Sequence, residues 1–312
     1  MKLNSLPTDS KREVELKRFA ERACYVLALA FLQTPLRKIG FRAPAQTQFE
    51  SKERSLENRV NDIPEYCKLF RRFARFEGQI VVELGSNEGY LLKSFLETEK
   101  FTAIGADLNG SALDRGRANC GERIKFVQTT PTSIPLSDSS VDIFYTIDTI
   151  EHLSSPREIF MEVFRVLKPG GLFLVHFNPW LNPYGSHLGD IIPFPWPHVV
   201  FSMDTLLRVA SKLYDSPAYP VAWYWYDDSG KKRPNPYVDR QGWDTFLNYM
   251  TIRRFNEFLK ELPFEQLHQE RIGFGGKTYK ITRYLRGLSQ VRGLDEFFTN
   301  ALFTVLTKRR LH

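Results

Sequence analysis

Short apolar runs alternate with amphipathic segments between residues 79 and 178. The runs QIVVEL and GLFLVHFN are apolar enough for strands that are buried on both faces, whereas PREIFMEVFRVLK has the spacing of a helix. Strands and helices in this order are typical of a parallel sheet that is covered on both sides. The pattern therefore predicts an α/β, doubly wound domain at 79–178.

The segments on either side of this domain have different patterns. Helical spacing predicts one helix at 11–34, ended by Pro35, and a second at 62–73 with Pro64 in its first turn. Residues 179–242 lose the alternation and are rich in proline, tryptophan and tyrosine, which indicates an ordered cap rather than a disordered loop. Helical spacing returns after this segment, and two strand-like runs, FEQLHQERIGF and ALFTVLTK, close the chain.

These patterns predict four parts. They are an N-terminal helical segment covering the cleft (1–78), a cofactor-binding α/β core (79–178), a substrate cap insertion (179–242), and a C-terminal helix with the last two strands, completing the core (243–312).

Composition excludes several classes of protein. The 312 residues are 42% hydrophobic, enough for a sizeable core, and the net charge of +7 permits anionic partners without identifying one. The longest apolar run, Ala23–Leu32, has ten residues, about half of the ~20 needed to cross a bilayer. Acidic residues near the N-terminus argue against a signal peptide. The cysteines form no CxxC pair, so we expect a reducing, cytoplasmic location; they are Cys24, Cys67 and Cys120.

The stretch VVELGSNEG ends the first predicted strand and leads into a helix. Ligands of doubly wound sheets bind at such strand ends, and Gly85 and Gly89 would let the backbone approach one closely. The spacing is neither the G-x-G-x-x-G of a dinucleotide site nor that of a P-loop. Asn87, midway between the glycines, is a residue type that tolerates positive φ, so a tight turn can form there.

Two acids end consecutive predicted strands, Glu83 and, 24 residues later, Asp107. A carboxylate at the end of the second strand can accept hydrogen bonds from both ribose hydroxyls of a nucleotide. The first carboxylate lies beside the loop and suits a cationic or amino-bearing group. Together they indicate a nucleoside with a positively charged tail.

With these features, residues 79–178 resemble the class I S-adenosylmethionine-dependent methyltransferases, and most closely the small-molecule type that includes quinone-biosynthesis enzymes. The loop matches their E/D-x-G-x-G-x-G motif except at Asn87, and SVDIFYTIDTIEHL and VLKPGGLFLV match later motifs in order. The resemblance implies a mostly parallel, seven-stranded Rossmann-like sheet with an antiparallel last strand, and S-adenosylmethionine as cofactor.

The resemblance also implies a set of cofactor-binding residues. One departs from the family: Thr130 stands where an Asp often pairs with the adenine amino group, and a hydroxyl would pair more weakly. The implied residues are Glu83, Gly85, Ser86, Asn87, Gly89, Asp107, Leu108, Thr130 and Asp148.

Methyl transfer needs a positioned nucleophile and, where that nucleophile carries a proton, a base. Candidate bases are Glu151 and His152 after the fourth strand and His187 in the cap, with Asp190 as a further option. Because His187, Asp190 and His198 lack a recognised metal-binding spacing, we predict no metal site. Four cap aromatics could either wall an apolar or planar acceptor or pack the cap onto the core: Trp180, Tyr184, Phe194 and Trp196.

The leading hypothesis is a methyltransferase with a small-molecule acceptor under the 179–242 cap. Basic residues on the first helix and on a predicted helix at 277–292 permit peripheral contact with an anionic membrane surface. They also leave open an RNA methyltransferase, although no separate RNA-binding module is recognisable and nucleic acid is not the expected partner. A third alternative is a non-catalytic S-adenosylmethionine-binding module.

Overall fold

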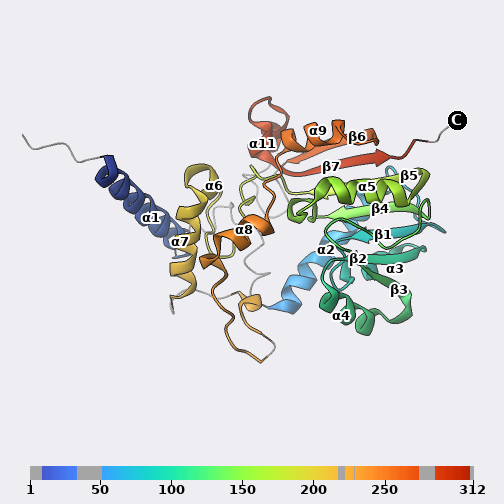
Figure 1. Cartoon of the computed structure of the whole chain (residues 1–312), viewed down its shortest axis with the longest axis horizontal. Coiled ribbons are helices and arrows are strands. Elements are labelled where there is room, and N and C mark those ends of the chain that lie inside the picture. Colours follow the sequence, from blue (N-terminus) through green and yellow to red (C-terminus); the bar gives the residue numbers. More distant parts are fainter. Residues whose placement is uncertain (1–8, 34–50, 217–221, 228, 274–284, 310–312) are drawn as a thin grey trace, which may run out of the picture.

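The computed structural model describes residues 9–33, 51–216, 222–227, 229–273 and 285–309 (Figure 1). Its centre is a seven-stranded sheet in the order β3-β2-β1-β4-β5-β7-β6, in which β7 is antiparallel to both neighbours and the other pairs are parallel. The predicted fold class is confirmed. The strands are β1 Ile80–Leu84, β2 Thr102–Asp107, β3 Ile124–Gln128, β4 Val141–Ile147, β5 Leu167–Phe177, β6 Glu265–Gly273 and β7 Thr299–Thr307.

The strand order reverses at the centre of the sheet. From β1 the chain adds β2 and β3 on one side, and it then crosses to place β4 and β5 on the other. The carboxyl ends of β1 and β4 therefore lie next to each other with their connections leading in opposite directions. In doubly wound sheets this arrangement opens a crevice that ligands occupy.

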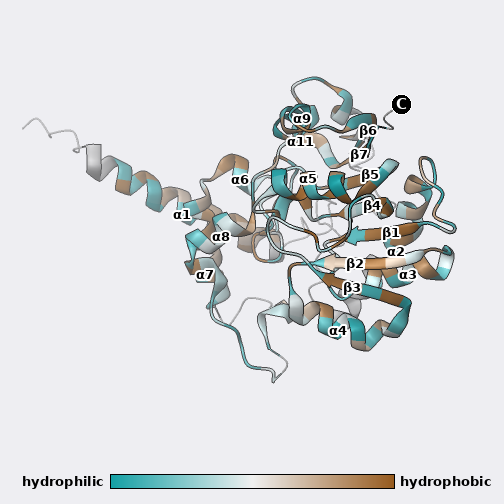
Figure 2. Cartoon of the chain, turned by 45° about the vertical axis from the view of Figure 1, so that its right-hand side comes forward, coloured by the Kyte–Doolittle hydropathy of each residue, from teal (hydrophilic) through white to brown (hydrophobic). Residues whose placement is uncertain are grey.

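Helices cover both faces of the sheet and bury its apolar strands. On one face α5 Pro156–Val166 and α9 Ile252–Lys260 pack on the sheet, and on the other α2 Lys52–Phe70, α3 Tyr90–Thr98 and α4 Gly110–Cys120 do so. Figure 2 shows the hydrophobic colour concentrated in the strands. This burial on two sides explains why the core strands are continuous apolar runs in the sequence.

A second lobe forms around α7 Met203–Tyr214, on the left of Figure 1. The helix α1 Asp9–Gln33 packs against α7, where Glu21 accepts hydrogen bonds from Arg208 and Lys212 at 2.6 and 2.9 Å. The segment 1–78 is thus divided, since α1 packs on the cap and α2 on the sheet. The remaining helices and turns are α6 Pro197–Val200, α8 Arg240–Phe246, α11 Asp295–Phe298, η3 Gly121–Arg123, η4 Ile150–His152, η5 Trp223–Trp225, η6 Pro236–Val238 and η7 Arg286–Gln290.

Several expected helices differ in the structure. The second helix begins ten residues before the predicted start, so Pro64 lies inside α2 rather than in its first turn. Packing of its apolar face on the sheet outweighs the backbone hydrogen bond that proline removes. The periodic stretch after residue 245 is split between α8 and α9. The helix α7 was missed, although Ser202 caps it by accepting from the Thr205 amide, a recognisable start signal.

The sequence analysis made two further statements about helices, one on a basic surface helix and one on membrane spans. Half of the predicted basic helix at 277–292, residues 277–284, lies outside the described residues, so the prediction is not tested there; the described half contains η7. Within the described part of the chain, no helix is both long enough and apolar enough to cross a membrane.

Candidate functional site

The loop after β1 has three residues in the left-handed backbone region. Gly85, Asn87 and Gly89 have φ values of 82°, 49° and 74°. A Cβ at Gly85 would lie 2.2 Å from Thr149 Oγ1, so the loop passes tightly against the connection that follows β4. Asn87 adopts the positive φ that its residue type tolerates, as expected from the sequence.

The carboxylate of Asp107 fastens this loop to the end of β2. Its Oδ2 accepts the amide of Asn87 at 2.7 Å, and its Oδ1 accepts the amide of Asn109 at 2.8 Å. A carboxylate has about four lone-pair directions, so two backbone donors leave it able to accept further bonds. Asp107 is therefore a rigidly held acceptor at the mouth of the crevice.

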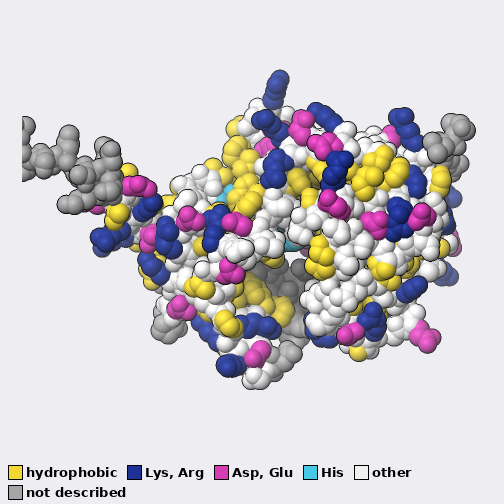
Figure 3. Space-filling view, viewed as in Figure 1, with side chains coloured by type: hydrophobic (Ala, Val, Ile, Leu, Met, Phe, Trp, Pro, Cys, Tyr) yellow, Lys and Arg dark blue, Asp and Glu magenta, His cyan; other side chains and the backbone are white. Residues whose placement is uncertain are grey.

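A cavity of about 780 Å³ opens at the carboxyl ends of β1 to β4, a volume within the usual range for small-molecule sites. Figure 3 shows the surface hollowed between the two lobes. Eight of the nine predicted cofactor residues line the cavity, while Gly89 instead packs closely on Phe126. The eight are Glu83, Gly85, Ser86, Asn87, Asp107, Leu108, Thr130 and Asp148, and the lining residues that the sequence analysis did not select include Asn109, Thr129, Thr149, Trp223 and Phe246.

Comparison with known proteins agrees with this geometry. Residues 82–175 match the family profile described as a methyltransferase domain, a range that runs from β1 into β5. This part of the chain is therefore a methyltransferase domain. Among curated relatives, an uncharacterized methyltransferase of Mycobacterium bovis (strain BCG / Pasteur 1173P2) is 32% identical over 111 residues, 35% of this chain and 43% of the relative.

Two further matches are limited in the same way, one by its coverage of the chain and the other by its low sequence identity. An uncharacterized methyltransferase of Mycobacterium ulcerans (strain Agy99) is 31% identical over 35% of this chain and 43% of its own length. The chain thus spans less than half the length of the curated relatives it matches. A chain from the Haloferax volcanii complex of the Trm112 methyltransferase activator with a methyltransferase superposes with a TM-score of 0.51, 16% identity, and coverage of 84% of this chain and 96% of that one. This likeness concerns the fold alone.

Within the methyltransferase domain, the predicted adenine contact Thr130 is already engaged in a turn. Its hydroxyl lies 2.8 Å from the Ser133 hydroxyl and 3.3 Å from the Thr132 amide. Thr130 still lines the cavity, but a ligand would have to share this hydroxyl with the turn. Glu83, at the end of β1, is only 2% exposed; burial, together with the charge of Glu83, raises the pKa of Tyr145 on β4.

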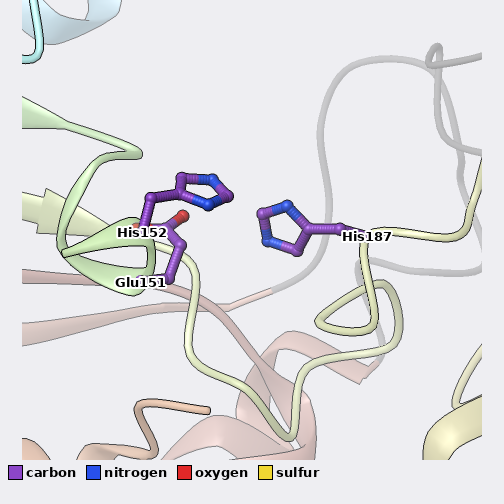
Figure 4. Close-up of side chains that lie close together, drawn as sticks. All are labelled: Glu151, His152 and His187. Atoms are coloured by element: carbon purple, nitrogen blue, oxygen red, sulfur yellow. The ribbon is translucent and has the colours of Figure 1, made fainter. Parts of the chain in front are cut away.

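The three candidate bases meet beside the cavity, as Figure 4 shows. Glu151 and His152 come from the turn η4 after β4, and His187 comes from the cap. Burial and the neighbouring Asp148 raise the pKa of Glu151 well above its usual range. Burial lowers the pKa of His152, and it lowers the pKa of His187 to about 3. Both imidazoles are therefore neutral at pH 7.

The fourth candidate, Asp190, does not join this group in the described structure. Its Oδ2 accepts hydrogen bonds from the hydroxyls of Tyr224 and, at 2.9 Å, Tyr237. Burial raises the pKa of Asp190. The two phenol donors favour a structural role in the cap lobe.

A short hydrogen-bonded clamp attaches the chain after α8 to the methyltransferase domain. Asn248 donates its side-chain amide to the carbonyls of Ile150 and Leu153 at 2.7 and 3.0 Å, and its backbone amide donates to the Glu151 carbonyl at 2.9 Å. His152 Nδ1 lies 2.9 Å from the Phe246 carbonyl. These bonds position Phe246 and His152 at the same edge of the cavity.

None of the four cap aromatics named from the sequence is among the residues that line the cavity. Trp180 packs on His198 and Tyr249, and Phe194 belongs to the buried cap core. Trp196 donates its indole N–H to the Phe297 carbonyl at 3.1 Å. Among the described residues, the aromatics that line the cavity from the later chain are instead Trp223 and Phe246.

Proposed function

We propose that this chain transfers a methyl group from S-adenosylmethionine to a small-molecule acceptor held between the methyltransferase domain and the cap. The observation that carries the proposal is one cavity with two unlike walls. The cofactor wall is the group Glu83–Glu88, Asp107–Asn109 and Thr129–Pro131, and the acceptor wall is the group His152–Ser154, Trp223 and Phe246.

The cofactor wall matches the chemistry of a nucleoside with a charged tail. Asp107 is held by two backbone amides and can accept both ribose hydroxyls. The left-handed loop at Gly85 exposes backbone close to the cavity, and Glu83 supplies negative charge beside it for an amino or sulfonium group. When bound, the cofactor would supply a methyl group on a positively charged sulfur.

The acceptor wall supplies apolar surface and a neutral base. Trp223 and Phe246 offer aromatic faces to a planar or apolar acceptor. The Phe246 carbonyl can only accept, so His152 donates from Nδ1 and keeps its lone pair on Nε2. Because burial lowers its pKa, His152 remains neutral at pH 7 and can accept a proton from an acceptor hydroxyl or amine.

The test is calorimetric titration of the purified chain with S-adenosylmethionine and, separately, with S-adenosylhomocysteine. We expect saturable binding of both ligands at one site per chain. Binding of neither would contradict the cofactor assignment. Binding of both without methyl transfer to any acceptor in a broad screen of phenols, quinols and amines would favour the non-catalytic module.

We further propose a cytoplasmic location with peripheral contact to an anionic membrane surface. Three buried free cysteines suit a reducing compartment. On α1, Leu16 and Phe19 are 62% and 72% exposed and lie close in sequence to the basic residues Arg18 and Arg22. Co-sedimentation with phosphatidylserine vesicles, but not with phosphatidylcholine vesicles, is the expected result, and Phe19→Glu should reduce it.

A further inference from the structure

Three side chains with metal-binding chemistry converge from two distant segments. Glu151 and His152 are neighbours in η4, and His187 approaches them from the cap, so that one ligand atom from each lies within 4.8 Å of the others. Figure 4 shows the two imidazole side chains pointing toward each other, with the carboxylate of Glu151 beside His152. The rings are 4.8 Å apart between centroids, at 84° to each other.

The carboxylate is the unusual member of this group. Glu151 is 3% exposed, and among the described residues no side chain donates a hydrogen bond to its carboxylate, which lies close to the backbone amides of Glu151 and Asn178. Burying a carboxyl group with too few hydrogen-bond partners costs free energy. Protonation does not remove this cost, since a buried carboxylic acid also needs an acceptor for its O–H. A cation would satisfy both oxygens at once.

The imidazoles of His152 and His187 are also held in a way that suits a cation. The contact of His152 Nδ1 with the Phe246 carbonyl sets the ring so that Nε2 is the free coordinating atom, an arrangement typical of metal-bound histidines. His187 is held at a φ of 55°, a conformation that a non-glycine residue adopts when its surroundings impose it.

In contrast to the prediction of no metal site from the sequence, we propose that Glu151, His152 and His187 form a site for a borderline divalent transition-metal cation such as Zn²⁺. Two histidines and one carboxylate are a ligand set that leaves a coordination position open. With Zn–N and Zn–O bonds of about 2.0–2.1 Å, tetrahedral ligand atoms are about 3.3 Å apart, so the group needs to close by about 1.5 Å. Rotation of the side chains can supply such a movement.

The loaded site would change the role of His152. Its Nε2 lone pair would bind the metal instead of accepting a proton, and an acceptor oxygen or water on the open position would lose its proton more readily. His152 lines the cavity, so the cation would lie beside the acceptor wall. Metal binding itself does not depend on the proposed methyl transfer and can be measured without it.

The test is titration of the chelator-treated full chain with Zn²⁺ and with Co²⁺, whose visible absorption reports the coordination geometry. We expect one metal ion per chain and a Co²⁺ spectrum of low coordination number. His187→Gln and Glu151→Gln should each weaken binding roughly 100-fold or more, since loss of even an outer-sphere partner costs about 10–100-fold. Circular dichroism and the affinity for S-adenosylhomocysteine report whether each variant remains folded.

The matched control is His268→Gln on β6. His268 Nε2 lies 3.2 Å from Glu270 Oε2 at the edge of the sheet, which makes it a histidine–carboxylate pair outside the proposed site. Full binding by this variant, with loss in His187→Gln, supports the proposal. Equal binding by all variants, or loss in His268→Gln alone, overturns it. Absence of S-adenosylhomocysteine binding would contradict only the proposed function.

Discussion

The two walls of the cavity differ in how they are built. The cofactor wall comes from the ends of three consecutive strands, and its main groups are backbone amides and the carboxylate of Asp107. The acceptor wall joins parts of the chain that are far apart, such as His152 and Phe246, which are 94 residues apart and yet in hydrogen-bond contact. One wall follows from the order of the strands, and the other depends on how the cap folds back.

This difference indicates which parts of the site can change independently. A loop at a strand end retains its geometry as long as the sheet and a few backbone-specific residues are present. The acceptor wall instead needs side chains from distant segments to reach the cavity. It also needs the chain after α8 to be attached to the methyltransferase domain, and the hydrogen bonds of Asn248 provide this attachment. Acceptor choice can therefore vary while the cofactor wall is kept.

The largest effect is expected at the cofactor wall, from Asp107→Ala. Two charge-assisted hydrogen bonds to ribose would be lost, each worth about 1.5–3 kcal/mol, so affinity for S-adenosylhomocysteine should fall roughly 100-fold or more. Calorimetry measures this directly. The control is Asp114→Ala on α4, where an exposed carboxylate pairs with Arg117 outside the cavity. Equal affinity in both variants would remove Asp107 from the site.

The second prediction separates two reasons for glycine at a positive φ, with Gly78 before β1 and Gly85 in the loop after it. Gly78 and Gly85 both have positive φ, but a Cβ would meet nothing within 4 Å at Gly78 and would clash with Thr149 at Gly85. Gly78→Ala should cost about 1–2 kcal/mol of unfolding free energy from backbone strain alone. Gly85→Ala should cost about 2–5 kcal/mol, because overpacking adds to the strain. Urea unfolding measures both, and equal costs would show that the close approach to Thr149 is unimportant.

The same contrast explains what could be predicted from sequence. The alternation of strands and helices, the turn at Asn87 and the position of Asp107 follow from local periodicity and from glycine spacing, because each depends on residues close in the chain. The seven strands and the antiparallel last strand were implied by the family resemblance instead. The lining by Trp223 and Phe246 did not follow, because composition identifies aromatics without saying which of them face a cavity. The helix α7 was hidden for a different reason: its proline-rich surroundings made the whole cap look irregular.

Breaking the clamp should affect the acceptor wall alone. Asn248→Ala removes two side-chain hydrogen bonds to the Ile150 and Leu153 carbonyls, at about 0.5–1.5 kcal/mol each, so we expect a loss of about 1–3 kcal/mol in unfolding free energy. Affinity for S-adenosylhomocysteine should stay the same. Asn119→Ala is the control, since that amide makes a long contact of 3.4 Å with the Tyr90 hydroxyl. A joint loss of stability and cofactor affinity would show that the walls are coupled.

The smallest effect concerns the cap, where His198 packs on Trp180 with 4.5 Å between ring centroids, and burial lowers the pKa of His198 to about 4. From about pH 7.5 upward the imidazole is neutral in both the folded and unfolded states, so it contributes no pH dependence there. Between pH 6.5 and 4 the unfolded chain binds the proton and the folded chain does not, and stability therefore falls as the pH falls.

At pH 5.5 this difference amounts to about 1.4 kcal/mol relative to pH 7.5. His198→Gln should remove that part of the pH dependence, whatever constant cost the substitution adds at both pH values. Glu151, His152 and His187 also titrate, but they are present in both the wild-type chain and His198→Gln. Their contributions therefore cancel when the pH dependence of the unfolding free energy is compared between the two proteins. The unfolding free energy is measured by urea unfolding at both pH values. If it changes with pH by the same amount in the wild-type chain and in His198→Gln, His198 is solvated in the folded state. The cap would then be open near Trp180, and this tryptophan would again be a candidate to contact the acceptor.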